Sequence, residues 1–121
     1  MKRVLLVDDN YSNLYLMRFM FEKNGFQVLA AESGAEGVEK AITEKPDLII
    51  MDIQLPDISG YEATKKIRES NTDGDIYIVA FTSFAMAGDR DKAFAAGCNG
   101  YIAKPINPET FMEEIKAFIA F

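Results

Sequence analysis

The sequence contains no histidine, and its only cysteine is Cys98. Without histidine the chain cannot form a Ser-His-Asp or Cys-His catalytic arrangement, and most zinc sites are excluded as well. One cysteine cannot form a disulfide within the chain, which fits a reducing compartment, and we expect Cys98 to be a small packing residue. Chemistry in this protein therefore depends on carboxylates, hydroxyls and lysines, a set of groups that suits hard cations such as Mg²⁺.

Long hydrophobic runs and an excess of positive charge are also absent. No apolar stretch approaches the length of a membrane span and the N-terminus lacks a signal-peptide pattern, so we expect a cytoplasmic protein without membrane insertion. The net charge of −6 argues against direct nucleic-acid binding, because such a surface is normally basic. The 121 residues, 49% hydrophobic and 26% charged, predict one globular domain over residues 1–121, with no linker or effector domain.

Short apolar runs alternate with helical patterns along the chain. Strands are predicted at residues 4–7, 27–31, 48–51, 76–80 and 101–103. Helices are predicted at residues 11–24, from Ser33 to before Pro46, from Ser59 to about residue 70, up to about Gly97, and after Asn107-Pro108. This alternation predicts an α/β fold, a doubly wound five-stranded parallel sheet with helices on both faces.

In an open parallel sheet, ligands bind beyond the carboxyl ends of the strands. The residues expected there are Asp8 and Asp9 after the first strand, Asp52 after the third, Thr82 and Ser83 after the fourth, and Lys104 after the fifth. Carboxylates so close together repel each other by roughly 4 kcal/mol per pair at an effective dielectric constant of about 20, and a bound divalent cation would relieve this repulsion.

The same residues suit phosphoryl transfer to a carboxylate. Asp9 and Asp52 are natural direct ligands of the cation, a backbone carbonyl near Gln54 is a third, and Asp8 could bind directly or through water. Catalysis of such a transfer is mainly positioning and charge stabilisation, with Asp52 as nucleophile and the Thr82 hydroxyl and Lys104 ammonium on the phosphoryl oxygens. Because the chain has no histidine to carry a phosphohistidine, another molecule must be the donor.

Each feature alone has an ordinary structural explanation, for example a helix cap at Asp8-Asp9-Asn10. Their occurrence after four different strands favours a functional site. A flavodoxin-like electron carrier is an alternative, but an acidic loop at Asp8 and Asp9 would repel a flavin phosphate. An aspartate-nucleophile phosphatase is another, but it would need a second aspartate two residues after the nucleophile, where Gln54 stands.

At these residues the sequence resembles the receiver domain of two-component response regulators. The matching segments are residues 7–10, residues 48–56 with Ser59-Gly60, residues 80–83 and residues 97–105, and the resemblance covers essentially the whole chain. It is strongest to stand-alone regulators and receivers of hybrid histidine kinases. It implies a flavodoxin-like fold with strand order 2-1-3-4-5. A degenerate receiver used only for binding is disfavoured by the intact acidic set.

The resemblance also implies the partners, the cofactor and the roles of individual residues. The implied donor is a histidine kinase or a histidine phosphotransfer protein, and the implied target is a downstream protein. The chain is implied to assist its own phosphorylation and dephosphorylation rather than to act as an enzyme on a separate substrate. The implied assignments are phosphorylation at Asp52, Mg²⁺ (or Mn²⁺) at Asp8, Asp9, Asp52 and the Gln54 carbonyl, Thr82 and Lys104 at the phosphoryl group, and switching or tuning at Ser83, Phe84, Tyr101 and Pro105, with a cis bond before Pro105.

A separate hypothesis concerns Phe84 and the lifetime of the phosphorylated state. A bulky apolar side chain beside the phosphorylation site would hinder an attacking water and lengthen the phosphorylated state. Phe84→Glu should then accelerate dephosphorylation, and an unchanged rate would contradict the hypothesis.

The first predicted helix has more apolar residues than one buried stripe requires. We expect Leu16, Met17, Met20 and Phe21 to face the core, and Tyr11, Leu14 and Tyr15 to lie on the opposite face beside Arg18. Such an exposed patch suggests a docking surface for the phosphodonor, although ordinary amphipathic packing remains an alternative. By resemblance, the output surface comprises the fourth helix, fifth strand and fifth helix, with Phe84, Met86 and Tyr101 toward it.

Overall fold

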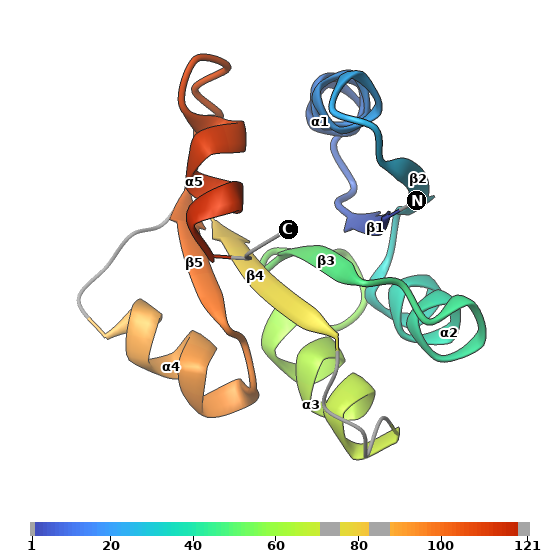
Figure 1. The fold of residues 1–121 in the computed structure, drawn as a ribbon. Helices are drawn as coiled ribbons and strands as arrows, with labels where there is room; N and C mark the ends of the chain where they lie inside the picture. The colour runs from blue at the N-terminus through green and yellow to red at the C-terminus, as the bar shows by residue number, and fades with distance from the viewer. Residues whose placement is uncertain (1, 71–75, 83–87, 119–121) are drawn as a thin grey trace.

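The computed structural model describes residues 2–70, 76–82 and 88–118 (Figure 1). Its strands are β1 (Arg3–Val7), β2 (Gln27–Ala31), β3 (Leu48–Asp52), β4 (Tyr77–Thr82) and β5 (Gly100–Ala103). Its helices are α1 (Tyr11–Lys23), α2 (Gly34–Glu44), α3 (Gly60–Ser70), α4 (Asp89–Ala96) and α5 (Phe111–Phe118). Each strand is followed by a helix, as the alternating pattern predicted.

The strands form one parallel sheet in the order β2-β1-β3-β4-β5, which confirms the predicted flavodoxin-like topology. Helices α1 and α5 cover one face of the sheet, and α2, α3 and α4 cover the other (Figure 1). The chain winds outward in one direction from β1 to β2 and in the other from β1 to β3. The carboxyl ends of β1 and β3 therefore lie side by side at the point where a doubly wound sheet binds ligands.

Strand residues alternate between two cores because successive side chains point to opposite faces of the sheet. Toward α1 and α5 the strands bury Val4, Leu6, Leu48, Ile50, Val79 and Phe81. Toward α2, α3 and α4 they bury Leu5, Val7, Ile49, Met51, Ile78 and Ala80. Burial on both faces explains why β1, β3 and β4 are continuous apolar runs rather than alternating ones.

Most of the predicted helix ends are confirmed. The side chains of Asn10, Ser33 and Ser59 accept hydrogen bonds from the N–H groups of the residues three positions later. Gly25, with φ of 85°, follows the Asn24 cap of α1. The start of α5 was predicted too early: residues 107–110 form a turn in which the Asn107 carbonyl accepts from Phe111 N, and the helix begins at Phe111.

Among the described residues, none of the helices combines the length and the hydropathy that crossing a bilayer would require.

Candidate functional site

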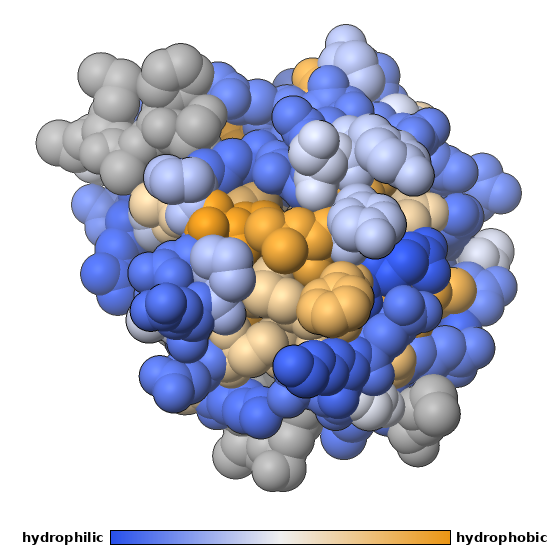
Figure 2. All heavy atoms as spheres, turned by 90° about the horizontal axis from the view of Figure 1, so that it is seen from above, coloured by the Kyte–Doolittle hydropathy of each residue, from blue (hydrophilic) through white to orange (hydrophobic). Residues whose placement is uncertain are grey.

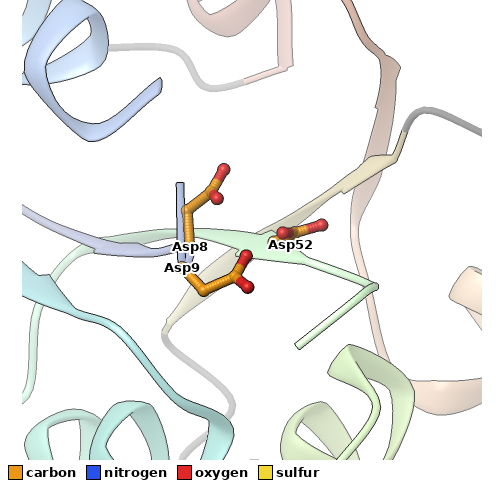
Figure 3. A group of neighbouring side chains, drawn as sticks. All are labelled: Asp8, Asp9 and Asp52. Carbon is orange, nitrogen blue, oxygen red and sulfur yellow. The ribbon is translucent and has the colours of Figure 1, made fainter. Parts of the chain in front are cut away.

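Three carboxylates meet at the carboxyl edge of the sheet. Asp8 and Asp9 follow β1 and Asp52 is the last residue of β3, and Figure 3 shows the three side chains gathered there. One oxygen of each lies within 4.8 Å of one oxygen of each of the others. Asp8 and Asp52 are almost completely buried, whereas Asp9 is exposed. The arrangement confirms that the sheet brings together the acidic residues selected from the sequence.

Asp8 is held in place by the first turn of α1. Its Oδ1 accepts a hydrogen bond from Asn10 N at 2.8 Å, and its Oδ2 accepts one from Asn13 Nδ2 at 3.2 Å. Asn10 is the residue that caps α1, so the cap interpretation holds for Asn10, while Asp8 faces the other carboxylates. Sequence reasoning missed Asn13, whose only signal is its position one turn into a helix that starts beside the site.

Lys104 brings a positive charge to the carboxylates. Its Nζ lies 3.3 Å from Asp52 Oδ1 and 3.6 Å from Asp8 Oδ2. The ammonium also lies 5.0 Å from the centre of the Phe81 ring, within cation–π distance, a contact that was not predicted from the sequence. The Lys104 N–H donates to the Thr82 carbonyl at 2.7 Å, so the ends of β4 and β5 set the position of this lysine.

Burial of Asp52 raises the pKa of its carboxyl to about 6, since water can no longer solvate the charge. The backbone N–H of Gln54, 3.1 Å from Asp52 Oδ1, opposes this shift. The Asp8 carboxylate raises the pKa further, and the Lys104 ammonium lowers it. One ammonium does not balance three carboxylates, so the site favours binding of a further cation.

Two further features place the Asp52 backbone. Ile53 N donates to the Phe81 carbonyl at 3.1 Å, and Gly60 N donates to the Ile53 carbonyl at 2.9 Å. A Cβ at Gly60 would lie 2.3 Å from the Asp52 carbonyl oxygen, so only glycine allows α3 to begin this close to β3. The loop between β3 and α3 is therefore drawn back over the end of β3, with the exposed Gln54 at its start.

The other predicted residues have different outcomes. Thr82 is the last residue of β4 and is 2% exposed, at the same edge of the sheet. Tyr101 is half-buried in β5, and the bond between Lys104 and Pro105 is cis, as predicted. Ser83, Phe84 and Met86 lie outside the described residues. Cys98 is buried and lies 3.8 Å from Thr64 Oγ1, consistent with a packing residue.

The exposed face of α1 differs from the prediction. Leu14 is only 8% exposed and packs in the core, so its assignment to the outer face was wrong. The large apolar residues of α1 that are exposed are Tyr11, Tyr15 and Phe19, at 75%, 66% and 59%. They recur every fourth residue and so form one row on the helix, and Phe19 had not been singled out. Figure 2, which views the side covered by α1 and α5, shows an apolar area bordered by hydrophilic residues.

The donor set of the site fits a hard divalent cation. It consists of carboxylate oxygens without histidine or thiolate, which suits Mg²⁺ and Mn²⁺ better than zinc or copper. Two buried carboxylates that share one lysine are costly without additional positive charge. The residues present therefore fit a metal-assisted reaction at Asp52.

Comparison with known proteins identifies the class that this fold and site define. Residues 4–116 match the family model of the response regulator receiver domain, and the chain belongs to this family of two-component signalling proteins. It is 40% identical over 118 residues to the polar-differentiation response regulator DivK of Brucella anthropi, covering 98% of this chain and 96% of that protein. Membership implies a histidine kinase or a phosphotransfer protein as partner.

Solved structures agree with this assignment. The chemotaxis protein CheY4 of Vibrio cholerae superposes with a TM-score of 0.91 at 28% identity, over 98% of this chain and 99% of that one. The receiver domain of the sensor histidine kinase PA1611 from Pseudomonas aeruginosa has a TM-score of 0.87 at 32% identity, over 99% and 98% of the two chains. That structure has a magnesium ion coordinated in its active-site cleft. Neither comparison supports an electron carrier or a phosphatase.

Proposed function

We propose that this receiver domain, residues 1–121, is a phosphorylation-dependent switch that accepts a phosphoryl group on Asp52 and signals through protein–protein contacts. The observation that carries the proposal is the environment of Asp52. Its buried carboxylate is grouped with those of Asp8 and Asp9, and the Lys104 ammonium lies 3.3 Å away. Family membership supports the proposal independently.

The chemistry follows from the roles of these residues. An Asp52 oxygen attacks the phosphorus of a phosphohistidine on the donor, a P–O bond forms as the P–N bond breaks, and the electron pair remains on the donor's imidazole. Lys104 and the Thr82 hydroxyl stabilise the charge that spreads over the phosphoryl oxygens. Mg²⁺, which Mn²⁺ could replace, would be held by Asp8, Asp9, Asp52 and the Gln54 carbonyl and would neutralise charge on both reacting groups.

The chain thus assists its own phosphorylation and dephosphorylation and does not act as an enzyme on a separate substrate. The donor is a histidine kinase or a histidine phosphotransfer protein, and it docks on α1 beside the site, where Tyr11, Tyr15 and Phe19 are exposed. A downstream protein reads the phosphorylated state at the face formed by α4, β5 and α5, which carries Tyr101. The net charge of −6 disfavours nucleic acid as a direct ligand, and the place of action is the cytoplasm.

Intact mass measurement after incubation with acetyl phosphate and Mg²⁺ tests the proposal without knowledge of the partner. One phosphoryl group should add to the parent, and none should add to Asp52→Asn or when EDTA replaces Mg²⁺. Asp47→Asn is the matched control, because Asp47 lies just before β3, outside the acidic group. No gain on the parent, or an equal gain on Asp52→Asn, would overturn the assignment of Asp52.

A further inference from the structure

The loop between β3 and α3 makes an unexpected connection to α2. The carboxylate of Asp57, in the middle of this loop, accepts hydrogen bonds from Gly34 N at 2.8 Å and Ala35 N at 2.9 Å. These are the first two residues of α2, and their N–H groups have no acceptor within the helix. A loop residue more than 20 positions away in the sequence therefore completes the start of this helix.

The N–H groups in the first turn of α2 donate to two different side chains, those of Ser33 and Asp57. Ser33 Oγ accepts from Glu36 N at 3.2 Å, a local cap that ties the helix only to the residue before it. Asp57 takes the two preceding N–H groups and so ties the helix to the loop. The same helix end thus offers a local cap and a long-range link that can be removed separately.

The packing around Gly34 independently shows how close the loop comes to α2. A Cβ at residue 34 would lie 2.4 Å from Ile58 Cγ1 and 3.2 Å from Asp57 Oδ1, so the loop passes directly over the bare Cα of Gly34. Ile58 also packs against the core on this side of the sheet. The loop is therefore seated against the helix by both a polar and an apolar contact.

The charge on Asp57 keeps its carboxylate an acceptor for these N–H groups over a wide pH range. The N–H groups of Ala35, Gly34 and Ile58 lower the pKa of the Asp57 carboxyl to about 2, so it stays ionised throughout the physiological pH range. A carboxylate at a helix N-terminus is also favoured by the helix dipole. Asp57 itself is exposed, so water can replace it at the N–H groups, and we expect its replacement to leave the protein folded.

The loop held in this way contains the residue whose carbonyl completes the proposed metal site. Gln54 follows the acceptor by two residues and precedes Asp57 by three. Its N–H is bound to Asp52 Oδ1 at one end of the segment, and at the other end Gly60 N is bound to the Ile53 carbonyl. Asp57 holds the segment between these two anchors through its hydrogen bonds to α2.

We propose that Asp57 is a positioning residue of the Mg²⁺ site, which by binding the N-terminus of α2 fixes the loop that carries Gln54. The inference rests on the proposed function, because it concerns the metal that assists phosphorylation of Asp52. Residues that orient metal ligands without touching the metal typically change its affinity by about 10- to 100-fold when they are replaced. Asp57 would belong to this group although it lies outside the acidic cluster.

Calorimetric titration with Mg²⁺ near neutral pH tests the role of Asp57. Asp57→Ala should weaken Mg²⁺ binding by about tenfold, and Asp57→Asn, which keeps the shape and one acceptor oxygen, by less. Ser33→Ala is the matched control, because it removes a hydrogen bond from the same helix end without releasing the loop. It should leave the affinity within about twofold of the parent. Circular dichroism establishes that each variant is folded.

Two further readouts separate positioning from a general loss of helix stability. In metal-free protein, amide hydrogen exchange in residues 53–59 should accelerate in Asp57→Ala but not in Ser33→Ala. The rate of phosphorylation by acetyl phosphate should recover in Asp57→Ala as Mg²⁺ approaches saturation, because the acceptor itself is unchanged.

The outcomes distinguish this inference from the function on which it rests. If Asp57→Ala binds Mg²⁺ as tightly as the parent, or if Ser33→Ala weakens binding equally, the positioning role is wrong while the metal site stands. If the parent binds no Mg²⁺, the proposed metal site fails and the inference fails with it.

Discussion

Replacing Asp52 by asparagine should stabilise the metal-free protein at neutral pH, although it removes the proposed acceptor. Burial and the neighbouring Asp8 carboxylate raise the pKa of Asp52 from its usual 3.8 to about 6. The folded protein therefore binds a proton on this group more tightly than the unfolded chain does. Between about pH 4 and pH 6 the folded state holds more protons, so the free energy of unfolding falls as the pH rises through this window.

The size of the effect follows from the shift. One pKa unit corresponds to about 1.4 kcal/mol, so a shift of roughly two units makes the ionised carboxylate cost at most about 3 kcal/mol at neutral pH. Asparagine has nearly the same shape and no charge. We expect Asp52→Asn to raise the free energy of unfolding by about 1–3 kcal/mol at neutral pH, and by progressively less toward about pH 4, where Asp52 is itself protonated.

Urea denaturation followed by circular dichroism in EDTA measures this difference at each pH. Asp47→Asn is the control, since the Asp47 carboxylate accepts a hydrogen bond from Arg3 N at 2.9 Å and its removal should not be stabilising. Mg²⁺ should reduce the difference in stability between the variant and the parent. At a tenfold excess over its dissociation constant it would stabilise the parent by about 1.4 kcal/mol, and it should stabilise Asp52→Asn much less. A variant less stable than the parent at neutral pH, or a gain independent of pH, would refute the reasoning.

Three further predictions concern the surroundings of the acceptor. Lys104→Met should destabilise the metal-free protein by about 1–3 kcal/mol in urea denaturation, because Asp8 and Asp52 lose the ammonium near both; unchanged stability would show that the charge is already screened. Gly60→Ala should cost about 1–3 kcal/mol, since its Cβ would meet the Asp52 carbonyl at 2.3 Å, and an unshifted urea midpoint would contradict this. The double variant Tyr15→Ala, Phe19→Ala should be phosphorylated by acetyl phosphate at the parent's rate. It should receive phosphoryl groups about tenfold more slowly from a histidine phosphotransfer protein that phosphorylates the parent. Equal slowing with both donors would exclude a docking role.

The acidic site was predictable from the sequence because the sheet topology determines where its residues lie. Once strands are recognised as parallel, their carboxyl ends must lie at one edge, and Asp8, Asp52 and Lys104 follow from position alone. β1 and β3 were also easy to recognise as strands. Both faces of the sheet are covered, so these two strands are continuous apolar runs.

The errors fall where position along the chain does not determine orientation. Leu14 and Phe19 were misjudged because α1 carries apolar residues all round, so no single stripe identifies its buried face. The start of α5 was misplaced because Asn107 first stabilises a turn, with Glu109 N donating to its side chain at 3.0 Å. Asp57 could not have been recognised, since a loop carboxylate meeting a helix N-terminus more than 20 residues away leaves no periodic signal in the sequence.

The position of Lys104 suggests how a change at Asp52 would reach the proposed output face. The ammonium lies 3.3 Å from Asp52 and 3.6 Å from Asp8, so it is paired with both carboxylates. A phosphoryl group on Asp52 would compete with these carboxylates for the ammonium. The lysine backbone is bonded to Thr82 at the end of β4, and Tyr101 lies three residues earlier in β5. On the proposed assignment, any shift of Lys104 toward a phosphoryl group must therefore be accommodated by the ends of β4 and β5. β4 and β5 pair with each other and border α4 and α5 (Figure 1). Coupling between Asp52 and the proposed output face therefore needs no pathway through the rest of the core.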